Sequence, residues 1–349
     1  LSSETNAIGV IRLSALGDAV LLVPLIEKIV ESELYSEVVW ITTQPVIDLI
    51  GPLKNCRFVV VEKPSGVRSF FRTLKVLRKQ KFEKLIVAQA SFSAHLLSIM
   101  IEAKCKIGFD KRRGKDLHHW FIDKAIPYRD EHFVDAYLSF ADFVGVKQEL
   151  NKRMWHSAFK HLDLGFAKKY RSEGSPLIVV NPHASKIERR WTNVGYKKLI
   201  ESFIKRNCSV VLVGSDNPVE VSLNQEIAEC FGARIDNLTA SLSLKEWASL
   251  LSEADLLVAP DTGAIHTANA LNTPTIGLYA VANPKRTGAY GRLENSIDKY
   301  PEAVAKFGNL KPIDFHVRVH DKRAMELIEF DDVWQKASQI IDTLVINDR

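Results

Sequence analysis

The sequence predicts an α/β protein of two doubly wound domains, on three observations. The chain has 349 residues, which is more than one compact domain usually holds. Short β-rich runs alternate with helix-length stretches along both halves, the pattern of βαβ units in a parallel sheet. This alternation is lost over residues 151–175 and resumes after a Gly-Ser-Pro sequence. We therefore predict one domain at 1–170 and a second at 171–330.

Each predicted strand is a short run rich in β-branched or other apolar residues. The runs of the first domain are 8–13, 38–43, 58–62, 85–90 and 106–109; those of the second are 177–181, 209–214, 233–238, 256–259 and 275–279. Apolar residues recur at helical spacing over 330–345. The final segment, 331–349, is therefore predicted to be an amphipathic helix that packs on one domain, with the N-terminal domain as one option.

The composition indicates a folded, soluble protein, with 46% hydrophobic and 26% charged residues. The four cysteines form no C-x-x-C pair, so we expect reduced thiols in a cytoplasmic protein. The N-terminal residues lack the basic and apolar regions of a signal peptide. The longest apolar stretch, 85–101, is interrupted by polar residues, so we expect no transmembrane helix.

The first domain carries most of the positive charge. Residues 51–130 hold 18 Lys and Arg against 7 Asp and Glu, an excess of 11. Two features stand out: a basic amphipathic helix over 67–79, with Arg68 and Arg72, and a basic loop with Arg112 and Arg113. Together they predict contact with an anionic acceptor or a membrane surface. The alternative for the helix is an ordinary solvated face.

The turn Asp261-Thr262-Gly263 is the clearest candidate for a phosphate site. It follows a buried strand and starts a helix at once. The free N–H groups and partial positive charge of a helix N-terminus suit phosphate, to which Thr262 adds a hydroxyl and Gly263 a close backbone approach. His266, one turn further, could bind a phosphate oxygen. The alternative is a helix cap without a ligand.

Asp18 lies where the first predicted strand turns into a helix over 19–30. A carboxylate there can act as general base toward a bound hydroxyl, or it can simply cap the helix. Gly17 gives this turn its conformational freedom.

Three residues of the second domain are further candidates for a ligand site. The loop after 177–181 carries Lys186 and Arg189, and either could bind phosphate; a solvated charged loop is the alternative. Glu220 follows the next strand and could accept hydrogen bonds from ribose hydroxyls.

Several common nucleotide-binding patterns are absent from the sequence. No two glycines are spaced G-x-G, and the P-loop pattern is missing, which argues against a dehydrogenase and a P-loop enzyme. No D-x-D occurs, so no pair of carboxylates is available to carry a divalent ion to a diphosphate. We therefore expect no metal and no cofactor, with cationic side chains neutralising the diphosphate.

Taken in order, these motifs resemble the heptosyltransferases of glycosyltransferase family 9, which build the inner core of bacterial lipopolysaccharide. The resemblance rests on RLSALGD at 12–18, RRW at 189–191, LSL at 242–244, DTGAIH at 261–266, and PTIGLY at 274–279 followed by NP at 283–284 and TGAY at 287–290. It spans most of the chain and is strongest to the subgroup that adds the first heptose.

The resemblance implies a GT-B fold, in which two Rossmann-like domains face a central cleft. It also implies an ADP-heptose donor, inversion at the anomeric carbon, and transfer to Kdo of the nascent lipid A core. Asp18 would be the catalytic base, and Thr262, Gly263 and His266, with Asp261 beside them, would hold the diphosphate. Such an enzyme acts on the cytoplasmic surface of the inner membrane of a Gram-negative bacterium, as a peripheral protein, and takes no nucleic acid.

Four positions depart from the family pattern. Arg189 stands where a phosphate-binding lysine is usual, which keeps the charge and changes its geometry. Val87 and Ala90 stand near positions where an aspartate and a glycine are common, and no glycine follows Tyr279. Two rival functions remain at this stage: a nucleotide-sugar epimerase of GT-B architecture, and a non-catalytic protein that binds anionic glycans.

Overall fold

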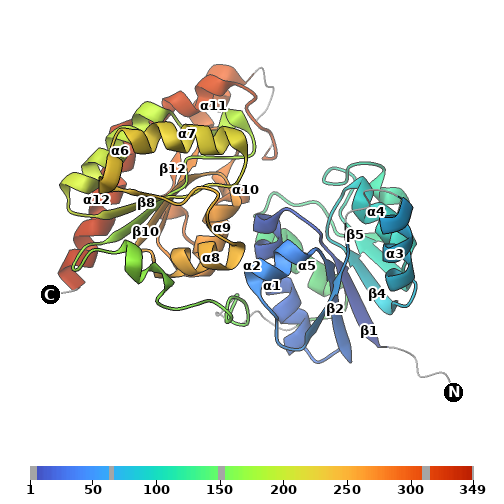
Figure 1. The fold of residues 1–349 in the computed structure, drawn as a ribbon. Coiled ribbons are helices and arrows are strands. Elements are labelled where there is room, and N and C mark those ends of the chain that lie inside the picture. The colour runs from blue at the N-terminus through green and yellow to red at the C-terminus, as the bar shows by residue number, and fades with distance from the viewer. Residues whose placement is uncertain (1–5, 63–66, 148–153, 309–314, 348–349) are drawn as a thin grey trace. The chain divides into compact units, whose positions relative to one another are not determined.

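The computed structural model describes residues 6–62, 67–147, 154–308 and 315–347. Side chains are not described at 67–70 and 345–347, so the predicted acceptor residue Arg68 lies outside the described side chains. Internal contacts divide the chain into a first unit, Leu1–His161, and a second unit, Leu162–Arg349. Each unit is built around one parallel sheet covered by helices (Figure 1).

The first unit holds six parallel strands in the order β3-β2-β1-β4-β5-β6. Its central strands are buried on both faces, as the apolar runs predict. The strands are β1 (Ala7–Ile11), β2 (Glu37–Thr42), β3 (Cys56–Val60), β4 (Lys81–Val87), β5 (Glu102–Gly108) and β6 (Lys124–Ala125), and the helices are α1 (Leu16–Glu31), α2 (Gln44–Ile50), α3 (Val67–Leu77), α4 (Phe92–Ile99), η1 (His118–Trp120) and α5 (Phe133–Phe143).

The second unit also holds six parallel strands, in the order β12-β11-β10-β7-β8-β9. The strands are β7 (Leu177–Val180), β8 (Ser209–Leu212), β9 (Asp236–Asn237), β10 (Leu256–Pro260), β11 (Thr275–Tyr279) and β12 (Ile297–Asp298). The main helices are α6 (Asn193–Lys205), α7 (Pro218–Glu229), α8 (Leu244–Glu253), α9 (Gly263–Ala270), α10 (Pro284–Thr287), α11 (Tyr300–Phe307) and α12 (Phe330–Asn347), with short turns η2 (Phe166–Tyr170), η3 (Ile187–Arg189), η4 (Gly232–Arg234), η5 (Leu293–Asn295) and η6 (Lys322–Leu327).

Read from β9, the second sheet has the same strand order as the first, counted along its own chain. In both sheets the chain starts at the centre, winds outward to one edge, and then returns to wind outward to the other. This is the doubly wound Rossmann order. The predicted fold class is therefore confirmed.

Two predicted boundaries need correction. The division falls after His161 and not after residue 170, because η2 packs against α8 and contributes Ala167 to a core of the second unit. The C-terminal helix α12 likewise packs on the second unit, where Val333, Ala337 and Ile341 enter its core. These residues repeat every four positions and form one helix face. The option of packing back on the N-terminal domain is therefore wrong.

Candidate active site

In each unit, the point where the winding changes direction marks the expected ligand position. Ligands of doubly wound sheets bind outside the carboxyl ends of the strands at this point. In the first unit it lies between β1 and β4, and in the second between β7 and β10. We call these two positions the first switch point and the second switch point.

At the first switch point, Arg12 and Gln89 join the ends of β1 and β4. The buried guanidinium of Arg12 donates to the carbonyl of Ala88 at 2.7 Å. The Gln89 side-chain oxygen accepts the backbone N–H groups of Leu13 at 2.8 Å and Ser14 at 3.2 Å. These hydrogen bonds connect residues far apart in the sequence and fix the turn that leads into α1.

Asp18 lies in the first turn of α1 and forms an ion pair with Arg12. The Asp18 side chain is 33% exposed, whereas that of Arg12 is 10% exposed. Burial lowers the pKa of Arg12, but the neighbouring Asp18 carboxylate outweighs it and the net pKa is raised. The helix is capped at Ala15 without a side-chain hydrogen bond. Asp18 is thus a partly exposed carboxylate that is paired with Arg12 and does not cap α1.

At the second switch point, Arg189 binds Asp261. One guanidinium nitrogen lies 3.2 Å from the Asp261 carboxylate and donates to the Asp261 carbonyl at 3.3 Å. Both side chains are largely buried, at 15% and 7% exposure. Arg189 follows β7 and Asp261 follows β10, so the pair bridges the two central strands. The structure brings these two predicted residues together.

The turn after Asp261 starts α9, as predicted. The Thr262 hydroxyl oxygen accepts the backbone N–H of Ala264 at 3.3 Å. Thr262 therefore caps the helix, and its hydroxyl hydrogen is left to donate. Gly263 is the first residue of α9 and His266 lies buried one turn further along it. Thr262 is therefore the N-cap of α9, and this cap is compatible with an anion at the same helix start.

The other predicted donor residues lie on neighbouring loops. Lys186 is exposed at the start of η3. The Glu220 carboxylate, at the start of α7, accepts both the backbone N–H and the hydroxyl of Ser215 at 2.9 Å. Glu220 thus organises the loop after β8, whatever else it binds.

Tyr279 lies beside Asp261, although its sequence motif indicated no role for it. The register pairs Pro260 with Leu278, so the next residues, Asp261 and Tyr279, leave adjacent strands together. The Tyr279 ring lies over Gly277, where a Cβ would come within 2.4 Å of it. Burial, with the nearby Asp261 carboxylate, raises the pKa of Tyr279 well above its ordinary value. Its hydroxyl has no hydrogen-bond partner among the described residues.

The predicted acceptor residues of the first unit differ in availability. Arg113 is buried and bonds to Asp110, to Glu131 at 3.3 Å, and to the carbonyl of Pro127 at 2.7 Å. This network gives Arg113 a structural role in place of the predicted acceptor contact. Arg112 is exposed, with its guanidinium 4.0 Å from the centre of the Tyr128 ring. Arg72 is exposed and lies 3.4 Å from Glu62.

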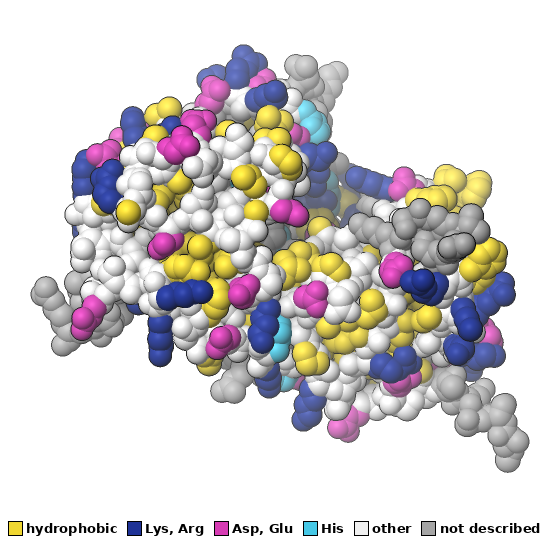
Figure 2. All heavy atoms as spheres, in the orientation of Figure 1, with side chains coloured by type: hydrophobic (Ala, Val, Ile, Leu, Met, Phe, Trp, Pro, Cys, Tyr) yellow, Lys and Arg dark blue, Asp and Glu magenta, His cyan; other side chains and the backbone are white. Residues whose placement is uncertain are grey.

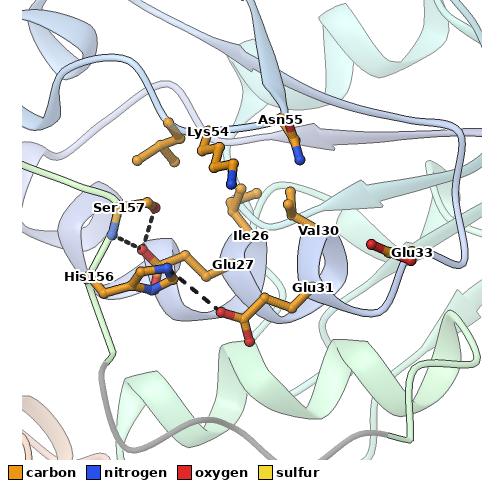
Figure 3. A pocket seen from close by; sticks show the side chains of 10 residues that line it. Ile26, Glu27, Val30, Glu31, Glu33, Lys54, Asn55, His156 and Ser157 are labelled. Carbon is orange, nitrogen blue, oxygen red and sulfur yellow. Dashed lines mark hydrogen bonds and ion pairs between the residues drawn. The ribbon is translucent and has the colours of Figure 1, made fainter.

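A separate cavity of about 430 Å³ lies away from both switch points, beside the C-terminal half of α1. Figure 3 shows Glu27 at its wall, facing His156 and Ser157. The Glu27 carboxylate accepts the Ser157 backbone N–H at 2.8 Å and lies 3.3 Å from the His156 ring. Since these contacts satisfy the buried carboxylate, we assign it to holding the segment after residue 153 on the first unit.

The described residues offer neither a metal centre nor a membrane-spanning helix. In the described part of the chain, no group of three or more His, Cys, Asp and Glu side chains is placed to hold a metal ion. No helix within the described ranges is long and apolar enough to span a membrane.

Comparison with known proteins places this geometry in a family. The model of glycosyltransferase family 9 (heptosyltransferase) matches residues 70–314. The lipopolysaccharide core heptosyltransferase OpsX of Haemophilus influenzae is 29% identical over 93% of this chain and 94% of its own. A family 9 glycosyltransferase structure from Veillonella parvula superposes with a TM-score of 0.77 at 20% identity, covering 97% of this chain and 98% of the other.

The structure of the Escherichia coli heptosyltransferase WaaC with ADP superposes with a TM-score of 0.72 at 17% identity, covering 96% of this chain and 99% of that one. These likenesses identify the fold as GT-B. Because the family model matches residues 70–314, which is most of the sequence, this chain belongs to glycosyltransferase family 9, the heptosyltransferases.

Proposed function

We propose that this enzyme transfers heptose from ADP-L-glycero-D-manno-heptose to Kdo of the nascent lipopolysaccharide inner core. The observation that carries the proposal is the Arg189–Asp261 pair at the start of α9, an arrangement suited to a diphosphate. Relatives named as lipopolysaccharide heptosyltransferases and a solved relative with bound ADP support both substrates.

The second unit is proposed to hold the donor. The first N–H groups of α9 and the Thr262 hydroxyl face the diphosphate, and Arg189 places positive charge beside it. Asp261 holds the Arg189 guanidinium in position through its carboxylate and its carbonyl. His266, Lys186 and Glu220 are proposed as further donor contacts.

The first unit is proposed to hold the acceptor and to supply the base. Asp18 takes the proton from an acceptor hydroxyl as its oxygen bonds to the anomeric carbon, and the bond from that carbon to the ADP oxygen breaks. Attack from the face opposite ADP inverts the anomeric configuration. Arg12 holds the Asp18 carboxylate in position through their ion pair. Arg72 and Arg112, with Arg68, are proposed to contact the anionic acceptor.

We propose that no metal ion is needed, because Arg189 and the α9 N-terminus neutralise the departing diphosphate. The enzyme is proposed to act at the cytoplasmic surface of the inner membrane as a peripheral protein. Neither nucleic acid nor a cofactor enters this reaction.

The test is a titration of the purified protein with ADP-heptose, ADP-glucose and UDP-sugars, followed by transfer to a deacylated Kdo-lipid acceptor. We expect binding selective for ADP-heptose. The product should carry heptose in the anomeric configuration opposite to that of the donor. Turnover of ADP-heptose without acceptor would support an epimerase instead. Loss of transfer in EDTA, restored by a divalent metal, would overturn the metal-independent account.

A further inference from the structure

The exposed surface of α4 is unusual for a soluble helix. Two residues of α4 are exposed, and both are large and apolar: Phe92 at 69% and Ile99 at 60%. Their spacing of seven places them on one helix face. The remaining residues of α4 are partly or fully buried. The outer face of this helix is therefore hydrophobic.

A second exposed apolar group lies on the loop after β5. Leu117 is 54% exposed and Trp120 is 71% exposed. The two are held on one turn, because the Trp120 backbone N–H donates to the Leu117 carbonyl at 2.9 Å. The loop is joined to α4, because the Phe92 backbone N–H donates to the Asp116 carboxylate at 3.2 Å. Phe92, Ile99, Leu117 and Trp120 form what we call the α4–η1 patch.

The backbone is strained where it presents Leu117. Asp116 and Leu117 both have left-handed conformations, with φ of 52° and 59°. Such conformations are unfavourable for residues other than glycine and persist where the surrounding structure imposes them. Here the strain turns a leucine toward solvent, where it gains nothing from packing. An exposed apolar patch held in place in this way marks an interaction surface.

A buried histidine pair supports the loop from inside. His118 accepts the Phe109 backbone N–H through Nε2 at 3.0 Å, and its Nδ1 lies 2.7 Å from Nε2 of His95. His95 stacks on Phe121 with the ring centres 4.8 Å apart. Burial lowers the pKa of His118 to about 4, so the pair stays uncharged at neutral pH. With His118 directed inward, its neighbours on both sides are directed outward.

Exposed positive charge lies beside the patch, on the loop after β5. Lys111, Arg112 and Lys115 are exposed on the same loop, and Asp116 is the exposed acidic residue beside them. The other basic residue of the loop, Arg113, forms ion pairs with Asp110 and Glu131 inside the first unit. In Figure 2, hydrophobic side chains and Lys or Arg side chains mix on the side of the first unit that carries α3 and α4. Aromatic and apolar residues flanked by cations match the interface of an anionic bilayer.

We propose that the α4–η1 patch inserts into the surface of an anionic phospholipid bilayer. Trp120, Leu117, Phe92 and Ile99 enter the headgroup region, and Lys111 and Lys115 contact lipid phosphates. Phe92 follows β4, and Leu117 and Trp120 follow β5, so these three come after the carboxyl end of the first sheet, the end at which Asp18 lies. Ile99 lies at the other end of α4, just before β5. Resting on the proposed function, this insertion brings Asp18 to an acceptor whose acyl chains remain in the bilayer.

The test measures binding of the full chain to vesicles of phosphatidylglycerol and phosphatidylethanolamine, with phosphatidylcholine vesicles for comparison. We expect preference for the anionic vesicles and weakening in high salt. The double variant Phe92→Ser/Trp120→Ser should bind about tenfold more weakly or worse. Leu164→Ser, which removes an exposed leucine of the second unit at 80% exposure, is the control and should bind as the wild type does.

Depth is measured by quenching with lipids brominated on their acyl chains. Part of the tryptophan fluorescence of the wild type should be quenched, and Trp120→Phe should lose that part. Quenching that is equal in both proteins would overturn the proposal, as would unchanged vesicle binding by a folded double variant. A wild type that self-associates through the patch, seen as a lower mass for the double variant in sedimentation, would overturn it in favour of a dimer interface.

Transfer assays separate this inference from the proposed function. The double variant should keep wild-type transfer to a deacylated, water-soluble acceptor and lose transfer to the same acceptor embedded in vesicles. Equal loss on both acceptors would show a saccharide contact and overturn the lipid assignment. If the wild type transfers to neither, the proposed function fails, and the vesicle and quenching measurements still decide the patch.

Discussion

The two switch points use the same pair of residue types in opposite ways. Each holds an arginine bound to an aspartate, at the same position of the same strand order. At the first, the arginine is buried and the carboxylate of Asp18 is partly exposed. At the second, the carboxylate of Asp261 is the more buried member and serves to hold Arg189. One arrangement exposes a carboxylate, the proposed base, and the other supports a cation beside a helix N-terminus.

The fold thus fixes where each Arg–Asp pair lies. Side-chain burial decides whether the carboxylate or the guanidinium of the pair faces a ligand. The doubly wound sheet places a loop, a strand end and a helix start at each switch point. The group that solvent and ligand meet depends on which partner the core covers. Substitutions at the two switch points test this difference.

Removing the exposed carboxylate should have the largest effect. Asp18→Asn keeps size and loses the base, so we expect turnover to fall by about 10²- to 10⁴-fold, with donor affinity nearly unchanged. The measurements are ADP release with both substrates and calorimetric titration of ADP-heptose. Asp142→Asn, which changes an exposed aspartate of α5 in the same unit, is the control. Unchanged turnover in Asp18→Asn would eliminate Asp18 as the base.

Removing the cation of the second pair should affect stability and donor binding together. Arg189→Met leaves a buried carboxylate without its partner, which should cost about 3–5 kcal/mol in unfolding free energy and weaken donor affinity. Arg189→Lys should keep most of both. Arg206→Met, which breaks an exposed pair with Asp342, should cost less than about 1 kcal/mol. Full donor affinity in a folded Arg189→Met would remove Arg189 from the donor site.

The turn at the first switch point is also held by an uncharged side chain, Gln89. Gln89→Ala removes the acceptor of two backbone N–H groups in the turn before α1, which should cost about 1–3 kcal/mol. Turnover should fall more than donor affinity, because the turn carries Asp18. Chemical denaturation and transfer kinetics measure the two effects. Gln225→Ala, on the exposed face of α7, should change neither, and a Gln89→Ala with wild-type values would show that the turn holds itself.

The smallest effect is expected at Tyr279. Tyr279→Phe removes a hydroxyl that has no hydrogen-bond partner in the described part of the chain, so stability should change by less than about 1 kcal/mol. Tyr196→Phe is a matched control, since its buried hydroxyl is in the same condition. Donor affinity should be unchanged in both. A loss confined to Tyr279→Phe would add its hydroxyl to the second switch point and make the two sites less alike.

Most of the fold could be predicted from the sequence because buried parallel strands read as continuous apolar runs. The strands β6 and β12 were missed, since two residues give no periodic signal. The predicted strand over 233–238 is shortened to Asp236–Asn237, because η4 turns the chain through Gly232, with φ of 58°. The helix start at Gly263 was indicated by the turn before it, whereas α1 begins at Leu16, three residues before the predicted start at residue 19.

The candidate residues could be predicted, but not the bonds between them. Asp18 and Asp261 are marked by their place at helix starts. Arg189 and Asp261 are 72 positions apart, and Gln89 lies 76 positions from Leu13, so only the folded sheet brings them together. The burial of Arg113 depends on Asp110 and Glu131 in the same way. Its sequence context, a run of cations, indicates a solvated loop and hides this structural role.

The short turn η2 determines where the two units can be separated. Phe166 and Tyr170 pack against the core that holds Ala167 and the buried side of α8, and the Ala167 backbone N–H donates to Glu253 at 3.1 Å. A fragment that starts at Leu162 keeps this cover, whereas one that starts at Arg171 exposes the hydrophobic side chains beneath it. Expression of the second unit by itself therefore requires the earlier cut, and the later one should yield aggregating protein.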